Sequence, residues 1–296
     1  MKAKEIIYTI RAMKSQEAGY LSEDYLQMLQ DRHENHFKNS NALDPGEPAV
    51  DKECRFRMVG WCYQVVDFCE FSRDTVAISI NYLDRFMSTF AGCHARTDRR
   101  TFQLAAMTCL YTAIKIHEPQ ALEPKVISEL SRGSYTEEEI TDMEREILEA
   151  MQWRMNPPTP LSFIQAFLSI IPDNVMKEID REAVTETAKY QTQLAVLDYH
   201  FLSCSPSSIA IAALVNAAQG MKNEHFDKTL QTISKALRMD INSQDDIKCR
   251  NRLWGALHEL PHSLSNKLIP QSSTVSKTIG STIVGHSPRA IISRSR

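Results

Sequence analysis

The chain has 296 residues, 43% of them hydrophobic and 24% charged, which suits a globular protein with two domains of ordinary size. Its formal net charge of −3 argues against a general electrostatic attraction of the whole chain to nucleic acid. No apolar run approaches the roughly 20 residues that a membrane-spanning helix needs, so we expect neither nucleic acid nor a membrane among its partners.

Residues 1–48 are predicted to be an N-terminal extension that contains a helix. The first 20 residues are mixed in character and predict a mobile segment with at most a short helix. Ser22 is a suitable N-cap for a helix that passes through Tyr25 and Leu29 toward Phe37. The Pro- and Gly-containing stretch that follows, at residues 39–48, is typical of a linker.

A first domain is predicted over residues 49–156, built from five helices. Apolar residues recur there at helical spacing over approximately 50–71, 74–91, 97–117, 123–131 and 137–153. Thr136 followed by Glu139 three residues later is a capping box at the start of the last helix. The run Asn156-Pro157-Pro158 cannot continue a helix, which places a domain boundary there.

Residues 157–262 repeat this helical plan and predict a second domain. Thr159 caps a helix with Pro160 at its first position. Later helices are expected over approximately 173–201, 205–221, 225–237 and 243–260. Residues 263–296 are rich in Ser and Thr, contain Lys and Arg but no acidic residue, and predict a disordered basic tail.

Two opposite charges stand in the first two helices of the first domain, in segments that are otherwise apolar. Arg55 lies among Met58, Trp61 and Cys62, and Asp84 lies between Leu83 and Met87. Buried helices rarely keep an Arg or an Asp that has no partner. We therefore predict that Arg55 and Asp84 form a partly buried structural ion pair.

These charges belong to a series of motifs in a fixed order. Arg55 is followed by Trp61, and the later motifs read N-Y-L-D-R-F at 81–86, F-Q-L-A-A-M-T-C-L-Y-T-A-I-K-I-H-E at 102–118, T-D-M-E-R-E-I-L at 141–148 and W-R-M-N-P-P-T-P-L-S-F at 153–163. This ordered set resembles the cyclin box, and the last motif is similar to the D-type, plant-like branch of the family.

The resemblance implies an all-α protein with two tandem five-helix cyclin folds. It implies a non-catalytic regulatory subunit that binds and activates a cyclin-dependent Ser/Thr protein kinase, with a role at G1 entry or the G1/S transition. No cofactor, metal or catalytic residue is expected. The seven scattered cysteines favour reduced thiols, which suits a protein of the nucleus and cytoplasm.

The resemblance also assigns the kinase-binding residues. Lys115 and Glu144 stand where cyclins hydrogen-bond to the backbone of the kinase, and Tyr25 and Leu29 are expected to add contacts. Without the resemblance, Lys115 would be interpreted as a charge near a helix C-terminus and Glu144 as a solvated surface charge.

A second family feature is a shallow groove that docks Arg-x-Leu peptides of substrates and kinase inhibitors. Its candidate residues here are Cys54, Met58, Trp61 and Gln103. This chain departs from the family pattern, because Arg57 replaces an apolar residue and Gln64 replaces an acidic one. An added positive charge and a missing negative one predict poor binding of Arg-bearing peptides. The alternative is that the groove residues belong to the core.

Three alternatives to a kinase-activating cyclin remain. A transcription-type cyclin would use the same fold, but the motif at 153–163 argues against it. A cyclin-fold transcription factor that binds DNA would need a basic face, which the net charge does not favour. An all-α enzyme would need a cleft with clustered ionisable residues, and no catalytic motif is visible.

Overall fold

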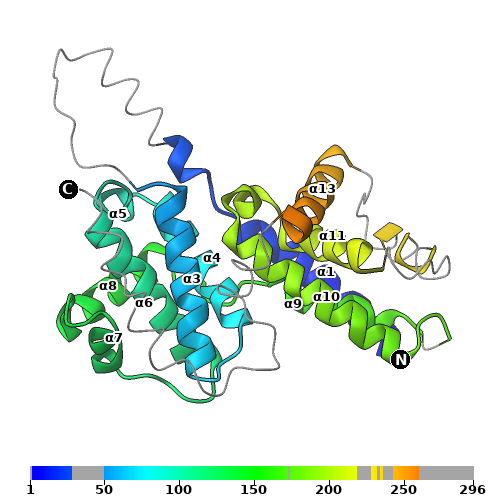
Figure 1. Ribbon diagram of the computed structural model, residues 1–296, viewed down its shortest axis with the longest axis horizontal. Helices are drawn as coiled ribbons and strands as arrows, with labels where there is room; N and C mark the ends of the chain where they lie inside the picture. The colour runs from blue at the N-terminus through cyan, green and yellow to red at the C-terminus, as the bar shows by residue number, and fades with distance from the viewer. Residues whose placement is uncertain are drawn as a thin grey trace, which may run out of the picture. The chain divides into compact units, whose positions relative to one another are not determined.

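The computed structural model describes residues 2–28, 50–172, 174–218, 228–231, 234–235 and 243–259, and all regular secondary structure in these ranges is helical. This confirms the all-α prediction for the described part of the chain. In its described part the chain divides into two compact units, one formed by residues 22–156 and the other by residues 2–21 together with the described residues between 157 and 259 (Figure 1). The predicted tail at 263–296 lies outside the described residues.

The unit formed by residues 22–156 is built around one central helix. Its helices are α3 (Lys52–Phe68), α4 (Asp74–Ser88), α5 (Cys93–Thr97), α6 (Arg99–His117), α7 (Pro124–Leu130) and α8 (Glu137–Ala150). Every residue of α6 from Phe102 to Ile114 is buried, because α3, α4, α5, α7 and α8 all pack against it. The largely apolar sequence of α6 between Phe102 and Ile114 therefore reflects a helix that is enclosed on all sides.

Local capping determines where these helices begin. The Asp51 side chain accepts a hydrogen bond from the amide of Cys54 at the start of α3, and Thr136 and Glu139 form the predicted capping box of α8. Asp98 caps α6 in the same way through Thr101, at 2.7 Å. The continuous helix predicted over 97–117 is therefore preceded by the separate short helix α5, since a residue in extended conformation must stand at the cap.

Helix α8 ends three residues earlier than the pattern predicts. Gln152 and Trp153 have φ angles of 52° and 59°, in the left-handed region, so the chain leaves the helix after Ala150. This conformation is uncommon for residues other than Gly. It turns the chain into the extended segment that leads to the second unit.

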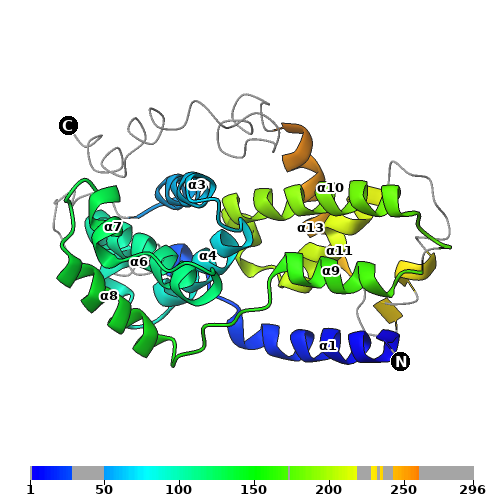
Figure 2. The same ribbon diagram turned by 90° about the horizontal axis from the view of Figure 1, so that it is seen from below.

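The first 17 residues correct the prediction of a mobile segment. They form helix α1 (Lys2–Glu17), which packs against α9 (Pro160–Ile170) (Figure 2). Ile10 of α1 is fully buried in the core that α9 helps to form. The carboxylate of Glu17 accepts hydrogen bonds from the amide and hydroxyl of Ser207, at 3.1 and 2.9 Å. The helix is thus stabilised by tertiary contacts that lie far away in sequence.

The start of the next helical turn also differs from the prediction. Asp24, rather than Ser22, accepts the hydrogen bond from the amide of Gln27, at 3.0 Å, and residues 25–28 are helical. Asp is as good an N-cap as Ser, and here it stands next to the first helical residue. The predicted continuation toward Phe37 and the linker at 39–48 lie outside the described residues.

The second unit surrounds α11 (Pro206–Ala218), which is buried along most of its length. Its neighbours are α9, α10 (Glu178–Leu197) and α13 (Gln244–Glu259), and the 3-10 turn η2 (Tyr199–Ser203) leads into it. Ser243 accepts a hydrogen bond from the amide of Asp246 at the start of α13. Of the helix predicted over 225–237, only residues 228–231 and 234–235 are described, and all of them are helical.

Candidate functional site

The two residues with the strongest functional assignment lie side by side on α6 and α8. Lys115 is in the last turn of α6, and Glu144 is in the middle of α8. The Lys115 Nζ atom lies 3.1 Å from Oε2 and 3.3 Å from Oε1 of Glu144. The Lys115 side chain is 48% exposed, while that of Glu144 is 10% exposed. A carboxylate that is almost enclosed is therefore covered by an amine that still faces solvent.

Neighbouring residues of α6 hold this pair in place. The hydroxyl of Thr112 donates to Glu144 Oε1 at 3.2 Å, and the Lys115 amine lies 5.4 Å from the centre of the Tyr111 ring. Partial burial by itself lowers the pKa of Lys115, but the hydrogen bond and charge of Glu144 and the contact with Tyr111 outweigh it. The pKa of Lys115 is therefore raised, and the amine carries its charge at neutral pH.

The chain just after α8 is fixed beside the end of α6. The carbonyl of Met155 accepts a hydrogen bond from the hydroxyl of Tyr82 and lies 3.1 Å from His117 Nε2. Because a carbonyl only accepts, this contact assigns the proton of His117 to Nε2. Arg85 donates to the carbonyl of Arg154 at 2.8 Å. These bonds position the segment that carries Trp153.

Large apolar side chains are exposed in both segments. Ile116, next to Lys115, is 47% exposed, and Trp153, after α8, is 70% exposed. Side chains of this size are usually covered in a folded domain. A charged pair with exposed apolar residues in the flanking segments has the composition of a protein-binding surface, in which apolar contacts give affinity and the charges give orientation.

Arg55 and Asp84 are brought together inside the same unit. Arg55 Nε donates to Oδ1 of Asp84 at 2.9 Å and Arg55 Nη2 donates to Oδ2 at 2.8 Å, and the two side chains are 4% and 8% exposed. The hydroxyl of Tyr25 adds a third hydrogen bond to Asp84 Oδ1, at 3.1 Å. The pair therefore joins α3, α4 and the chain around Tyr25.

This geometry corrects the kinase-contact role expected for Tyr25. The residue is 0% exposed, and its hydroxyl is directed to the buried Asp84, so its side chain offers no surface to a partner. We assign Tyr25 a structural role, since burial of its ring places the phenol against the ion pair. Leu29, the other expected contact in this segment, lies outside the described residues.

The four candidate docking residues are all buried. Their exposed fractions run from 0% to 5%, for Cys54, Met58, Trp61 and Gln103. Arg57 forms an ion pair with Glu53 at 2.7 Å. The side-chain amide of Gln103 has no hydrogen-bond partner within the described part of the chain. A bound peptide backbone is one group that could satisfy that amide, but the buried apolar residues fit the core interpretation, and substrate docking stays a prediction.

Sequence reasoning did not identify Thr112 and Tyr111 as parts of the Lys115 site, or Trp153 as an exposed residue. Thr112 and Tyr111 precede Lys115 by three and four residues, which is the spacing that places helical residues on one face. That spacing was available as a signal. No comparable signal existed for the exposure of Trp153, because the left-handed backbone at residues 152–153 determines it.

No group of three or more His, Cys, Asp or Glu side chains suitable for a metal ion occurs in the described ranges. In the same ranges, no helix combines the length and apolar character needed to cross a membrane.

Comparisons with protein families match nearly all of both units. Residues 24–156 match the family "Cyclin, N-terminal domain", and residues 158–274 match the family "Cyclin, C-terminal domain". The G1/S-specific cyclin-D1 of Danio rerio is 24% identical over 233 residues, which cover 78% of this chain and 77% of the relative. The G2/mitotic-specific cyclin-2 of Antirrhinum majus is 30% identical over 173 residues, or 58% of this chain and 36% of the relative.

The G2/mitotic-specific cyclin-B2 of Oryzias latipes is 28% identical over 165 residues and is covered for 40% of its length, so the chain spans less than half of these mitotic relatives. Among solved structures, a viral cyclin from herpesvirus saimiri has a TM-score of 0.51 at 17% identity. The match covers 71% of this chain and 88% of the viral chain. A chain of the CAK complex of Chaetomium thermophilum bound to ATP-gamma-S has the same TM-score at 15% identity. That match covers 95% of this chain and 91% of the other chain. Likeness at these identities shows the fold.

Proposed function

This chain belongs to the cyclin family, and from that premise we propose that it is a non-catalytic regulatory subunit that binds and activates a cyclin-dependent Ser/Thr protein kinase. The pair of Lys115 and Glu144 is the observation that carries the proposal. It stands at the motif positions through which cyclins contact the kinase, and the Lys115 amine is half exposed.

The pair can both donate and accept hydrogen bonds at one point of the surface. The Lys115 amine has three donors, and the two oxygens of Glu144 use two of them. The half-exposed amine would donate to a carbonyl of the kinase, and the carboxylate retains acceptor capacity for a backbone amide. Hydrogen bonds to charged groups are stronger than neutral ones and depend strictly on geometry. Such a pair fixes the orientation of a bound partner.

Activation is proposed to be a shift of population. A kinase exchanges between a state with its catalytic Lys–Glu pair assembled and a state without it. A surface that fits only the assembled state stabilises that state by the difference in binding free energy. The exposed Ile116 and Trp153 would supply the apolar contacts. Lys115 and Glu144 would fix the orientation of the bound kinase.

The buried pair of Arg55 and Asp84 supports this surface indirectly. It joins α3 to α4, and α4 packs directly against α6, the helix that carries Lys115. Loss of the pair would loosen the packing beneath the proposed contact. We therefore give Arg55 and Asp84 a positioning role and no direct contact with the kinase.

A role at G1 entry or the G1/S transition is the finer part of the proposal. It is supported by the D-type-like motif at 153–163 and by the similarity to a G1/S-specific cyclin-D1. A protein with that role would act in the nucleus and cytoplasm.

Co-purification tests the proposal directly. The tagged chain is incubated with a panel of cyclin-dependent kinases, and bound kinase and its activity on a protein substrate are measured. The wild-type chain should retain and activate at least one kinase, and a variant with Lys115→Ala and Glu144→Ala should do neither. Absence of any bound kinase with the wild-type chain would contradict the function. Equal activation by both proteins would contradict the assignment of the site.

A further inference from the structure

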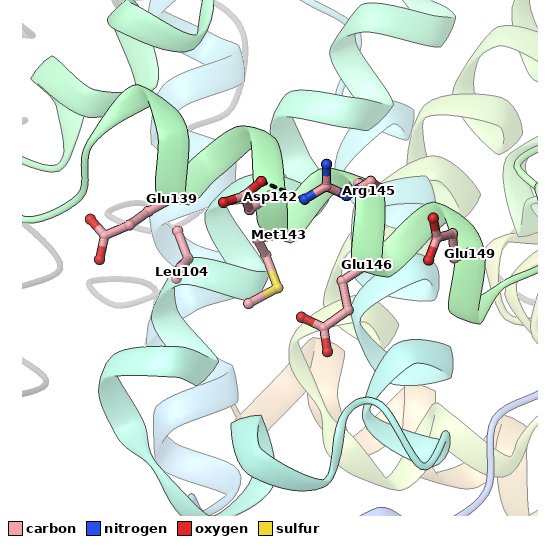
Figure 3. A pocket seen from close by; sticks show the side chains of 7 residues that line it. All are labelled: Leu104, Glu139, Asp142, Met143, Arg145, Glu146 and Glu149. Carbon is pink, nitrogen blue, oxygen red and sulfur yellow. Dashed lines mark hydrogen bonds and ion pairs between the residues drawn. The ribbon is translucent and has the colours of Figure 1, made fainter.

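A groove runs along the outer side of α8, with the buried Met143 at its base. It has a volume of about 430 Å³ and is lined by one residue of α6, Leu104, and by Glu139, Asp142, Met143, Arg145, Glu146 and Glu149 of α8. Figure 3 shows Leu104 and Met143 on its floor and the charged side chains around them. The groove therefore combines an apolar floor with an acidic rim.

The acidic residues follow one face of the helix and are unequally neutralised. Glu139 pairs with Arg100 at 3.0 Å, and Asp142 pairs with Arg145 at 2.6 Å. In the described part of the chain, Glu146 and Glu149 have no hydrogen-bond or ion-pair partner. Two unpaired carboxylates beside Leu104 and Met143, which are 9% and 7% exposed, favour an occupant that is mainly positively charged and adds a small apolar contact.

The end of the sequence has that composition. Residues 287–296 read S-P-R-A-I-I-S-R-S-R, with Ile291 and Ile292 between Arg289 and Arg294. No acidic residue occurs anywhere from residue 261 to residue 296. Charge and apolar content of this basic segment are thus complementary to the rim and floor of the groove.

The dimensions agree as well. From Glu139 to Glu149 the helix rises about 15 Å. An extended chain from Arg289 to Arg294 covers about 17 Å. Residues 260–286, roughly 27 residues, connect the basic segment to α13 and reach up to about 90 Å when extended. This reach is several times the radius of gyration of a unit the size of residues 22–156, which is about 14 Å.

We propose that residues 287–296 bind in the groove of α8, with Arg289 and Arg294 paired to its acidic rim and Ile291 and Ile292 on Leu104 and Met143. The bound segment would cover the side of α8 that is turned away from Glu144. It would therefore compete with any protein that approaches α8 from that side. The binding itself does not depend on the proposed kinase function.

Photo-crosslinking in the complete chain tests this binding without any partner. Ile292 is replaced by p-benzoylphenylalanine, whose excited ketone inserts into nearby C–H bonds and reacts readily with methionine. Irradiation of the dilute protein should give a monomeric product in which position 292 is joined to Met143, identified by mass spectrometry of its peptides. The yield should fall when the NaCl concentration rises from about 0.05 to about 0.5 M, since half-exposed ion pairs are screened.

Matched charge variants make the result specific. Glu146→Gln with Glu149→Gln should lower the yield at least about threefold, because each exposed ion pair contributes up to about a factor of five in binding. Glu137→Gln with Glu138→Gln removes the same charge from the first turn of α8, outside the groove, and should leave the yield unchanged. Equal yields in the two variants, crosslinks at sites outside the groove, or crosslinks only between two molecules would each overturn the proposal.

Discussion

Arg55 and Asp84, which are 29 residues apart in sequence, form a bidentate ion pair inside the unit of residues 22–156. Their side chains are 4% and 8% exposed. The cost of removing water from both charges is offset by two direct bonds and by a third from Tyr25. Such a pair contributes little net stability relative to an apolar pair, but loss of either partner leaves a buried charge alone.

Single substitutions of this pair should therefore be strongly destabilising. We expect Arg55→Ala or Asp84→Asn to lower the free energy of unfolding by about 3–5 kcal/mol, measured by urea denaturation. Arg57→Ala is the matched control on the same helix, because its ion pair with Glu53 is more exposed and should contribute at most about 1 kcal/mol. A loss below 1 kcal/mol for both buried variants would show that the pair is dispensable.

The hydroxyl of Tyr25 should contribute only through Asp84. Tyr25→Phe keeps the buried ring and removes one bond to a charged acceptor, so a loss of about 1.5–3 kcal/mol is expected. In the background of Asp84→Asn the same change should cost much less, because residues of one network are not additive. Tyr8→Phe, at a residue that is 68% exposed, should have no effect. Equal losses in both backgrounds would contradict the bond.

Acid should weaken the second unit through Asp198. Partial burial raises the pKa of this carboxyl, but Arg252 at 2.7 Å and the amide of His200 outweigh it, so the pKa is lowered overall. Because the pKa of Asp198 is lower in the folded state than its unfolded value of about 3.8, the ionised carboxylate stabilises the folded state at pH values above 3.8. This stabilisation is lost as the pH falls through the lower pKa of the folded state.

The difference in unfolding free energy between wild type and Asp198→Asn should thus be constant near neutral pH and shrink below about pH 4. Urea denaturation at a series of pH values measures it. A difference that does not depend on pH would mean that Asp198 is not preferentially ionised in the folded state.

The cysteines should differ widely in reactivity. Burial raises the pKa of Cys62 to about 12 and raises that of Cys109 well above its ordinary value, so neither thiol forms the reactive thiolate in the folded protein. A hydrogen bond from Cys249 outweighs burial at Cys204 and lowers its pKa. Timed alkylation with iodoacetamide and mass spectrometry should label Cys204 well before Cys62. Equal rates in the folded protein would refute this order.

Features governed by neighbouring residues were predictable from the chain alone. The capping box of Thr136 and Glu139 and the N-cap at Thr159 depend on contacts over three residues. The helical character of residues 97–117 was indicated by apolar residues at helical spacing. The ion pair of Arg55 and Asp84 was predictable because a charge buried in an apolar helix needs an opposite charge beside it, and these two helices offer one each.

Features governed by distant residues were not predictable. Helix α1 has a weak pattern of its own, and its place beside α9 depends on Ile10 and Glu17 finding partners more than 150 residues later. Tyr25 was misassigned because an aromatic residue on a helix is compatible with either a partner or the core, and only the position of Asp84 decides between them. The contact between Lys115 and Glu144 likewise depends on how α6 crosses α8.

The most direct test of the proposed function is a charge exchange, Lys115→Glu with Glu144→Lys. The exchange retains an internal ion pair but presents an acid where the kinase would meet an amine. Glu186→Lys with Lys189→Glu, an exchange on α10 in the other unit, is the control. We predict that the exchange at 115 and 144 keeps the melting temperature but lowers kinase binding and activation at least about tenfold, the size expected for losing hydrogen bonds to charged groups. Kinase binding and activation equal to wild type would contradict the account, because the pair would then serve only to join α6 to α8.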